Sequence, residues 1–450
     1  MPRAARFILV PVGSAGDVHP YVGLGRVLRD RGHEVFVLTN AHFKPLIRRS
    51  GLHFVEIGTE DDYDRFTRDP DLWHPRRGLL LVPRRGGLEP ARAVHDAVAR
   101  LHRPGATVVA ASALAFGARL AHETLGLPLA TIHLQPFAFP SLLRPPRPPF
   151  LAWTVRLPYP FRRLAYGVTH RLADRLFRVE IDTLRTELGL QPLQTSVLDW
   201  LHSPQCVIGL FPDWFAPPQS DWPDGSRLTG FPLFDESPLT PVEPEVVRFL
   251  DDGPLPLVFT AGSAMRHAAR FFDVSAQICR RLRRRGLFLT GHPEQLPASQ
   301  PPDVLHASYV PFSLLLPRCA LLVHHGGIGT TSQALAAGVP QLVVPRAFDQ
   351  PDNAERLIRL GVGDALGPRR YTPARGARVI EQLLNDPAMS GRCADVASRI
   401  RPGLDETCDL LESLIGTDRK QSRDRLPVRD RTQTGEEAEV RTSKRKKNRE

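Results

Sequence analysis

The stretch LLVHHGGIGTTSQALAAGVP, residues 321–340, joins an apolar strand to a glycine-rich turn and then to a helix of small residues. Glycines let a backbone approach a ligand closely, and the first N–H groups of a helix attract anions. The hydroxyls of Thr330 and Thr331 and the ring of His325 add further hydrogen-bond donors. Because the stretch contains neither Gly-Lys-Ser/Thr nor Gly-x-Gly-x-x-Gly, it is neither a P-loop nor a dinucleotide fingerprint. It predicts a diphosphate cradle, with a purely structural glycine turn as the alternative.

Strands and helices alternate on both sides of this stretch. Short apolar runs, which predict strands, occupy residues 6–12, 34–39, 53–58, 107–112, 127–134, 205–211, 256–263, 286–291, 304–310, 320–325 and 340–345. Helical spacing of apolar residues follows several of them, first at 20–31. This alternation predicts parallel sheets with right-handed crossovers, which bind ligands at the carboxyl ends of their strands. The predicted fold class is therefore α/β, with two doubly wound, Rossmann-like parallel-sheet domains facing each other across a cleft.

A proline-rich stretch with few periodic signals divides the chain into two halves. The predicted parts are a first domain over 1–215, an interdomain linker over 216–240, a second domain over 241–400, a C-terminal helix over 401–417 and a disordered basic tail over 418–450. A second proline-rich segment, 139–166, interrupts the first domain and mixes arginines with aromatic residues.

The net charge of +11 allows three kinds of anionic partner: nucleic acid, an anionic membrane surface or a phosphorylated small molecule. Residues 419–450 hold 12 basic and 6 acidic residues, so more than half of the excess lies outside the two domains. No apolar run reaches the roughly 18 residues of a membrane span, and the N-terminus lacks the core of a secretion signal. The five scattered cysteines, without Cys-x-x-Cys, indicate a reducing compartment. We expect a cytoplasmic protein, with peripheral contact at the inner membrane face left open and no nucleic acid partner.

A second polar motif follows the next predicted strand. Asp349 and Gln350 come directly after the run 340–345, so they can point into the same crevice as the glycine-rich turn. A carboxylate beside an amide suits the recognition of sugar hydroxyls. As the alternative, Asp349 would cap the helix that follows it.

Three motifs together resemble the inverting family 1 glycosyltransferases, which have the GT-B fold. They are His-His-Gly-Gly-x-Gly-Thr-Thr at 324–331, Asp-Gln-Pro-Asp-Asn-Ala at 349–354 and GSAGDVHPYVGLG at 13–25. The last is typical of the sterol, glycopeptide and rhamnosyltransferase branch. Segments 202–223 and 229–236 are similar to the rhamnosyltransferases of rhamnolipid synthesis. The resemblance spans residues 6–415 and implies an acceptor-binding first domain and a nucleotide-sugar-binding second domain.

The resemblance also implies which residues bind the donor. They are Gly262, Ser263, Tyr309, Val310, Pro311, His325, Gly326, Gly327, Gly329, Thr330, Gln333, Asp349 and Gln350. The nucleotide sugar is then a co-substrate, and neither a cofactor nor a metal ion is required, because the helix dipole and an imidazole can stabilise the leaving diphosphate. We expect the one Asp-x-Asp motif, Asp62-Tyr63-Asp64, to be solvated surface.

The first turn, Gly13 to Asp17, carries the predicted catalytic base. Many family members use a histidine at the position that Ala15 holds here. The resemblance to the glycopeptide-type branch implies that Asp17 is the base and takes a proton from the acceptor hydroxyl. His19 is the alternative base, because imidazole titrates near neutral pH. As a structural alternative, Asp17 would only cap the following helix.

The first domain is expected to bind the acceptor through His133, Gln135 and Phe137, which follow a strand end. Arginines beside aromatic residues in 139–166 suit an amphiphile with a carboxylate or an anionic membrane surface, and a loop that covers the core is the alternative. By resemblance, hydroxy-fatty-acid esters fit best, while sterols, hopanoids, carotenoids and polyketides remain open.

The predicted activity is therefore inverting transfer of a hexose to a hydroxyl of a lipid-like or small hydrophobic acceptor. Gln333 stands where many relatives carry a ribose-binding Glu, which favours dTDP-L-rhamnose over UDP-glucose as the donor. One alternative is a UDP-glucose-dependent enzyme that acts on a sterol, polyketide or macrolide, and another is a non-catalytic nucleotide-sugar-binding protein. A nicotinamide oxidoreductase is disfavoured, because its fingerprint is absent and Arg346 stands where its acid would be.

Overall fold

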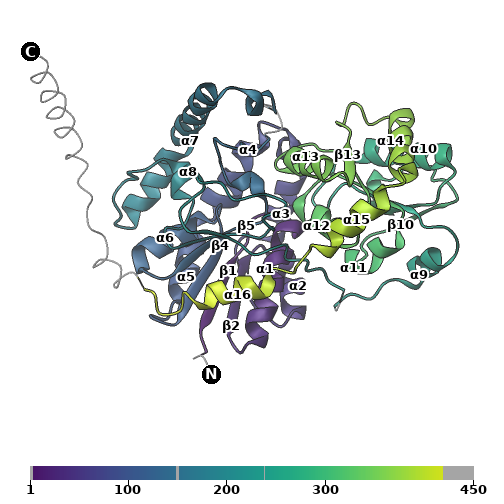
Figure 1. Cartoon of the computed structure of the whole chain (residues 1–450). Helices are drawn as coiled ribbons and strands as arrows, with labels where there is room; N and C mark the ends of the chain where they lie inside the picture. The colour runs from purple at the N-terminus through teal and green to yellow at the C-terminus, as the bar shows by residue number, and fades with distance from the viewer. Residues whose placement is uncertain (1–3, 148–151, 238, 419–450) are drawn as a thin grey trace, which may run out of the picture.

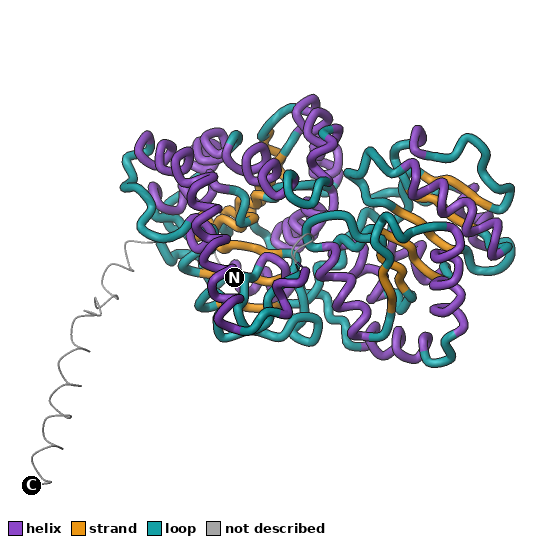
Figure 2. The backbone as a smooth tube through the Cα atoms, turned by 90° about the horizontal axis from the view of Figure 1, so that it is seen from above, coloured by secondary structure: helices purple, strands orange, loops and turns teal. Residues whose placement is uncertain are grey.

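The computed structural model describes residues 4–147, 152–237 and 239–418, which form two α/β domains (Figure 1). Almost all of the predicted tail, and residues 148–151 of the proline-rich segment, lie outside these ranges. Seen from above, the strands of the two sheets form two separate groups, each surrounded by helices (Figure 2). This is the predicted architecture of two doubly wound, parallel-sheet domains.

The sheet of the first domain runs in the order β3-β2-β1-β4-β5-β6-β7, with every neighbouring pair parallel. Its strands are β1 (Arg6–Val10), β2 (Glu34–Thr39), β3 (His53–Glu56), β4 (Thr107–Ser112), β5 (Leu129–His133), β6 (Cys206–Gly209) and β7 (Ser226–Leu228). Its helices are α1 (Ala15–Asp30), α2 (Lys44–Arg49), α3 (Glu60–Arg68), α4 (Gly78–Leu81), α5 (Ala91–Leu101), α6 (Phe116–Leu125), α7 (Tyr159–Glu187) and α8 (Val197–Trp200).

The sheet of the second domain runs in the order β10-β9-β8-β11-β12-β13, again parallel throughout. Its strands are β8 (Leu257–Thr260), β9 (Gly286–Leu289), β10 (Val304–Ala307), β11 (Leu321–His324), β12 (Gln341–Val343) and β13 (Gly363–Ala365). The helices of this half are α9 (Pro244–Asp251), α10 (Ala269–Leu282), α11 (Phe312–Leu315), α12 (Ile328–Ala336), α13 (Gln350–Leu360), α14 (Pro373–Asn385), α15 (Met389–Ser398) and α16 (Leu404–Glu412).

Each sheet has a topological switch point at its centre. β1 pairs with β2 on one side and β4 on the other, so that Leu9 is in register with both Val37 and Ala110. In the second sheet β8 lies between β9 and β11 in the same way. Because crossovers leave such neighbouring strands toward opposite faces, a crevice opens at their carboxyl ends. The turns after β1, β8 and β11 therefore lie where a ligand can reach the backbone.

Helix α1 begins at Ala15, five residues before the predicted start at Pro20. Ser14 is its N-cap residue, and the Asp17 carboxylate accepts hydrogen bonds from the Ser14 N–H (2.8 Å) and hydroxyl (3.1 Å). This capping box starts the helix upstream of the proline. Pro20 is tolerated inside the helix, although it has no N–H to donate to the Gly16 carbonyl. The turn between β1 and α1, predicted over 13–17, is therefore shorter than expected.

Two regions fold where no element was predicted. β7 lies inside the predicted linker, 216–240, and pairs with β6, so the first sheet continues beyond the predicted domain end at residue 215. The segment 59–101 forms α3, α4 and α5. Helix α3 begins at a capping box of Thr59 and Asp62, a signal that the sequence carries. β13, by contrast, is a short glycine-containing strand with little pattern to detect.

The last helix returns to the first domain. α16 packs against α1 (Figure 1), and its side chains Cys408 and Leu411 are buried. Arg31 at the end of α1 forms ion pairs with three acids of α16: Asp405, Asp409 and Glu412. The chain therefore passes between the domains twice, once through the linker and once on the way to α16. This double connection restricts how far the domains can separate.

Charged side chains also connect the domains beside the sheets. Arg266 Nη2 lies 2.6 Å from Asp64 Oδ1, so the expectation that Asp62-Tyr63-Asp64 is merely solvated surface is wrong for Asp64. Arg147, one of the arginines expected to face an anionic ligand, is bonded to the Glu355 carboxylate of α13. That arginine is thus occupied by a structural contact between the domains. Within the described part of the chain, no helix is long and apolar enough to span a bilayer.

The docking of α16 gives a prediction for stability. Replacing the fully buried Leu411 by Ala should lower the free energy of unfolding by about 2–4 kcal/mol, because it removes apolar contact and leaves a cavity under α16. Urea unfolding measures this loss. The matched control, Leu255→Ala at a half-exposed position, should change stability by less than about 0.5 kcal/mol. Equal effects of the two substitutions would contradict the packing role of α16.

Candidate active site

A cleft of about 1770 Å³ lies between the two domains. The turn after β1 and the end of β5 line it from the first domain, while the turns after β8, β11 and β12 line it from the second. These are the carboxyl ends of strands at the centres of both sheets, where doubly wound domains bind ligands. The linker also contributes, through residues 232–236.

The structure brings nearly all of the predicted site residues together at this cleft. It is lined by Asp17, His19, His133, Gln135, Phe137, Gly262, Ser263, Tyr309, Val310, His325, Gly327, Gly329, Thr330, Gln333, Asp349 and Gln350. Pro311 and Gly326 do not line it. Pro311 is the N-cap residue of α11, and Gly326, with φ 94°, packs its backbone against the Val343 side chain.

The ring of His325 lies between the backbones of two glycines. A Cβ atom at Gly262 would come within 2.9 Å of the ring, and one at Gly327 would come within 2.4 Å of its Nε2. No larger residue fits at either position while the ring stays in place. Burial, with the positive charge of Arg346 as a second cause, lowers the pKa of His325 to about 4. The imidazole is therefore neutral at physiological pH and can donate one N–H.

The N-terminus of α12 completes this cradle. Gly327 is the N-cap residue, and the backbone N–H groups that follow point outward from the helix start. Thr330 lines the cleft, whereas the Thr331 hydroxyl is fully buried and has no hydrogen-bond partner among the described residues. Gln333, one turn further, is also nearly buried yet borders the cleft. A neutral imidazole beside a helix N-terminus is suited to binding a diphosphate.

The alternative prediction for Asp349 is that it caps the helix that follows it. Asp349 does occupy the N-cap position of α13, but its side chain makes no capping hydrogen bond. Its Oδ2 accepts instead from the Asn353 side chain at 2.6 Å. Burial raises the pKa of Asp349 from its ordinary 3.8 to about 7, the Asn353 bond opposes this rise, and the negative charge of Asp17 adds to it. The carboxylates of Asp17 and Asp349, from opposite domains, thus interact across one cleft.

Gln350 acts mainly on its own loop. Its Oε1 accepts hydrogen bonds from the N–H groups of Arg346 (2.8 Å) and Ala347 (3.2 Å). Phe348 then adopts φ 55°, a left-handed conformation that is rare for a side chain of this size. Its ring packs at 72° against Trp73 of the first domain, with centroids 5.8 Å apart. The loop that carries Asp349 is therefore held by contacts within both domains.

Neither Phe348 nor Trp73 was predicted. A positive φ at a phenylalanine has no sequence signature, and Trp73 lies in the 3₁₀ turn Pro70–Trp73 of a segment without predicted elements. The same segment supplies Tyr63, which stacks on His42 at 4.2 Å and borders the cleft. The capping box before α3 was the only available signal for this wall.

Asp17 lies in the first turn of α1, with one carboxylate oxygen held by Ser14. Burial raises its pKa, and the hydrogen bonds from Ser14 partly oppose that rise. The alternative prediction of an N-cap role is therefore half right, because the carboxylate caps the helix from the third position while Ser14 is the N-cap residue. Gly13, with φ 137°, makes room for this arrangement, since a Cβ there would lie 2.2 Å from Asp17 Oδ2.

His19 is engaged by the linker. Its Nε2 lies 3.2 Å from Glu236 Oε1, and the other oxygen of Glu236 accepts from Arg49 at 2.9 Å. The bond from His19 is the largest cause that keeps the pKa of Glu236 below its usual value. The ring also packs edge-on against Phe234. His19 therefore connects α1 to the linker, and one of its two ring nitrogens is occupied.

His133 forms part of the cleft wall on the first domain. It is almost fully buried, its Nε2 has no partner among the described residues, and burial lowers its pKa well below the usual range. His202, which was not predicted, packs beside it with ring centroids 5.1 Å apart. Gln135 and Phe137 follow at the cleft surface. Burial lowers the pKa of His202 as well, so two neutral imidazoles lie side by side in this wall.

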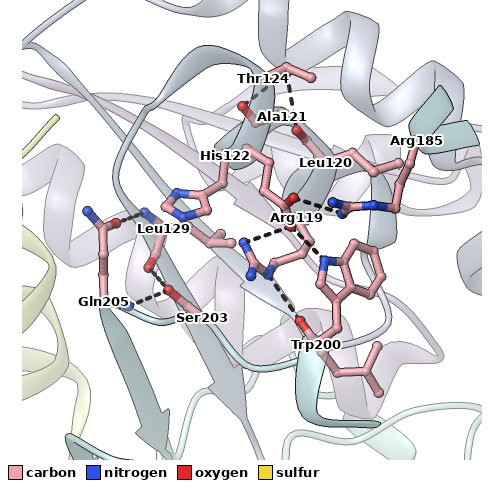
Figure 3. Close-up of polar contacts among 12 residues, drawn as sticks. Arg119, Leu120, Ala121, His122, Thr124, Leu129, Arg185, Trp200, Ser203 and Gln205 are labelled. Atoms are coloured by element: carbon pink, nitrogen blue, oxygen red, sulfur yellow. Dashed lines mark hydrogen bonds and ion pairs between the residues drawn. The ribbon is translucent and has the colours of Figure 1, made fainter. Parts of the chain in front are cut away.

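A buried charge network behind this wall fixes α6, α7 and α8 (Figure 3). The carboxylate of Glu123 lies 2.7 Å from Arg185 Nη1, 3.3 Å from Arg119 Nη1 and 2.6 Å from the Trp200 indole nitrogen. Burial alone would raise the pKa of Glu123, but its partners hold it below its usual value. The network anchors the C-terminal half of α7 to the first domain.

Within the described ranges, no group of three or more His, Cys, Asp or Glu side chains is placed to hold a metal ion. The five cysteines are all buried and free.

Known proteins are similar to this chain over nearly its whole length. Residues 7–139 match the glycosyltransferase family 28 N-terminal domain, and residues 289–406 match the erythromycin biosynthesis protein CIII-like C-terminal domain. O-mycaminosyltylonolide 6-deoxyallosyltransferase of Streptomyces fradiae is 31% identical over 441 residues, which cover 92% of this chain and 98% of that protein. Vancomycin aglycone glucosyltransferase of Amycolatopsis orientalis is 28% identical, with 88% and 94% covered.

Solved structures share the fold. The glycosyltransferase of kitacinnamycin superposes with a TM-score of 0.69 at 21% identity and covers 92% of this chain and 100% of that one. The spinosyn rhamnosyltransferase SpnG, solved with thymidine diphosphate, gives 0.62 at 19% identity, with 90% and 99% covered.

Two facing parallel sheets with an anion cradle and a carboxylate at one cleft define a glycosyltransferase of the GT-B fold. The chain belongs to the glycosyltransferase family that includes O-mycaminosyltylonolide 6-deoxyallosyltransferase, and it is of the macrolide, sterol and glycopeptide type.

The raised pKa of Asp349 gives a prediction for stability against pH. Between about pH 4 and pH 7 the folded chain keeps a proton on Asp349 that the unfolded chain releases, so this group lowers stability as the pH rises. Asp349→Asn should remove that loss. Relative to wild type, the free energy of unfolding of the variant should rise across this window by up to about 1.4 kcal/mol for each pH unit between the two pKa values.

Urea unfolding at a series of pH values measures the difference. A pH of about 3, below the window, is the internal control, because there the carboxyl group is protonated in the folded chain and largely so in the unfolded chain. Stability curves of variant and wild type that stay parallel up to neutral pH would contradict the burial of a protonated Asp349.

Proposed function

We propose that this chain transfers a hexose from a nucleotide sugar to a hydroxyl of a large apolar acceptor, with inversion at the anomeric carbon. The proposed donor is dTDP-L-rhamnose. The single observation that carries the proposal is the position of Asp17 in the same cleft as the cradle formed by His325 and the start of α12. A base on one side and a diphosphate site on the other are what a single displacement requires.

The donor assignment rests on the base and ribose end of the cradle. Gln333 borders the cleft with an amide where a ribose-binding carboxylate is common in the family, which suits a deoxyribose with one hydroxyl fewer. The spinosyn rhamnosyltransferase with the same fold was solved with thymidine diphosphate, and this supports a dTDP-sugar as well. UDP-glucose is the alternative donor.

The acceptor assignment rests on the size and lining of the cleft. A volume of about 1770 Å³ exceeds what a nucleotide sugar alone fills, and the walls on the first domain are mostly apolar. A hydroxy-fatty-acid ester is the proposed acceptor. A macrolide-like polyketide is the second candidate, favoured by the 31% identity to the tylonolide deoxyallosyltransferase.

In the proposed reaction, Asp17 takes the proton of the acceptor hydroxyl as the oxygen attacks C1 of the sugar. The bond from C1 to the diphosphate oxygen breaks on the opposite face, and the nucleoside diphosphate leaves with the electron pair. The helix dipole of α12 and the neutral N–H of His325 stabilise the charge that develops on it. Asp349 and Gln350 orient the sugar through its hydroxyls.

Asp17 is preferred to His19 as the base because of their partners. Only Oδ2 of Asp17 is used by Ser14, and a raised pKa brings the carboxylate closer to the proton affinity that a general base needs. His19 already shares its Nε2 with Glu236. In this proposal His19 keeps the linker in position beside α1.

A donor and acceptor panel tests the function. The chain is incubated with dTDP-L-rhamnose or UDP-glucose and with a hydroxy-fatty-acid ester, a sterol or a macrolide aglycone. We expect release of dTDP that depends on the acceptor, and a glycosylated ester in the mass spectrum with inverted anomeric configuration by NMR. If the chain binds a donor but releases no nucleotide with any acceptor, a non-catalytic protein is favoured. If only UDP is released, UDP-glucose replaces dTDP-L-rhamnose as the proposed donor.

Substitution of the base tests the mechanism. Asp17→Asn should lower kcat by at least about 10²-fold while dTDP binding stays within about twofold, because only proton transfer is lost. The acid limb in the wild-type pH profile of kcat/KM should lie above the usual range of an aspartate, since burial raises the pKa of Asp17. His19→Gln should keep most of the activity, and full activity of Asp17→Asn would refute the assignment.

Two glycines supply a matched pair for the same test. Gly13→Ala places a Cβ 2.2 Å from Asp17 Oδ2 and should reproduce the loss of kcat. Gly16→Ala, in the same turn, meets nothing closer than the Ser14 hydroxyl at 3.8 Å and should leave the Asp17 carboxylate in place. Similar kcat values for the two variants would show that the position of Asp17 does not matter.

A further inference from the structure

Helix α7 exposes a row of large apolar side chains. Phe161, Leu164, Val168, Leu172 and Val179 have exposed fractions of 58%, 62%, 53%, 53% and 75%. Their spacing places them on one face of the helix, as in a helix that packs on a core. Most other exposed large apolar side chains in the described part of the chain are scattered singly. A continuous row of this kind indicates a surface that is covered in function.

From Phe161 to Leu172 the charge around this row has one sign, and the exposed acid beside Val179, Glu180, is paired with Arg84. Between Glu123 and Asp174 the sequence contains no acidic residue but six arginines. Arg163, Arg171 and Arg175 on α7 are exposed, and no ion pair of theirs is found among the described residues. Asp174, the first acid of the helix, accepts from the Val197 N–H and is thereby turned toward the domain. Arg171 and Arg175 border the apolar row, while Arg163 lies on the other side of the helix, so the exposed face is both apolar and cationic.

The two halves of the helix are held differently. Its buried side chains, Ala173, Phe177, Ile181 and Arg185, all lie in its C-terminal half, whereas the N-terminal half contacts the domain through hydrogen bonds of Arg162 and His170. The C-terminal half is anchored by Arg185 in the Glu123 network (Figure 3). Asp182 adds a second anchor, because its carboxylate accepts from the Leu193 N–H.

The N-terminal half of the helix, at the top of the first domain in Figure 1, carries four of the five residues of the exposed row, and Val179 follows in the other half. Phe161, Leu164, Val168 and Leu172 also line the outer part of the cleft, together with Leu79 and Leu80 of α4. The exposed row is thus continuous with the proposed acceptor site.

We propose that this α7 surface, made of Phe161, Leu164, Val168, Leu172 and Val179 with Arg171 and Arg175, docks on an anionic lipid bilayer. Interfacial helices combine an apolar row, which enters the headgroup region, with arginines that pair with anionic lipids. The proposal rests on the proposed function in one respect, namely the route of the acceptor: an amphiphilic acceptor would enter the cleft from the bilayer along α7.

Charge decides against other occupants. A second copy of the chain would bring one arginine array against another, and residues 419–450 are themselves basic. Nucleic acid would match the charge but not a row of aliphatic side chains. An acidic protein surface is the remaining competitor, and vesicle binding by the purified chain separates it from a bilayer.

The experiment uses the full chain without donor or acceptor and measures co-sedimentation with vesicles. We expect binding to vesicles of phosphatidylcholine with phosphatidylglycerol, and much weaker binding to vesicles of phosphatidylcholine alone. Arg171→Gln with Arg175→Gln should weaken the partition coefficient about thirtyfold, from about 1 kcal/mol per arginine at an anionic surface. Leu164→Gln with Leu172→Gln should weaken it by at least about tenfold.

The control pair is Leu255→Gln with Ile358→Gln, which changes two exposed apolar side chains of the second domain and should leave binding unchanged. All variants keep the basic residues 419–450, so differences in vesicle binding among them measure the contribution of the α7 side chains. Since every substituted side chain is exposed, each variant should keep the wild-type Tm, and this is measured in parallel. Asp17→Asn, which removes only the proposed base, should bind vesicles like wild type.

Three results would overturn the proposal. Binding that is equal in the α7 variants and wild type would assign it to another part of the chain. Equal binding to neutral and anionic vesicles would remove the role of the arginines. Absence of binding to both kinds of vesicle would also reject the proposal. A dimer of the chain, or a complex with an acidic protein, detected by light scattering would then assign the α7 surface to a protein interface. Vesicle binding by a chain without transferase activity would instead leave the docking intact and reject only the proposed function.

Discussion

The imidazole of His325 is held between the backbones of Gly262 and Gly327, and the second half of the cleft depends on this contact. One glycine follows β8 and the other begins α12, so the ring fixes the distance between two turns at the switch point of the second sheet. Burial keeps the ring neutral, which lets it donate a hydrogen bond without a permanent charge in the cleft. The loop with Asp349 is then placed by Gln350 and by Phe348 against Trp73.

Two carboxylates face each other across this cleft, and both have raised pKa values because the domains exclude water around them. Asp17 is restrained by Ser14 and by the absence of a side chain at Gly13. The separation of the domains is restricted by α16, which returns from the second domain to α1. The reactive geometry therefore depends on contacts far from the cleft, since a shift of α1 against the second domain would move one carboxylate relative to the other.

Helix α7 connects the interior of the first domain to its surface. Its C-terminal half is fixed by the buried charges of Glu123 and Arg185, where removal of one partner would leave the other uncompensated. Its N-terminal half exposes apolar and cationic side chains beside the proposed acceptor part of the cleft. One rigid helix can in this way present the proposed docking surface and form a wall of the proposed acceptor site.

The sequence by itself determined the α/β class and the two parallel-sheet domains, and it named most of the residues that line the second domain's side of the cleft, because buried strands and glycine-rich helix starts carry strong local patterns. It also placed Asp17 and Asp349 after strand ends. Because the carboxyl ends of strands beside a switch point border one crevice, both residues were expected at the cleft. The sequence could not show that α1 starts at Ala15, that β7 extends the first sheet, or that Phe348 with φ 55° meets Trp73. Only the tertiary structure decided these, and it also engaged His19 with Glu236 and Arg147 with Glu355. The reason is physical: pairing partners, burial and left-handed backbone at a non-glycine residue depend on atoms that lie far away along the chain.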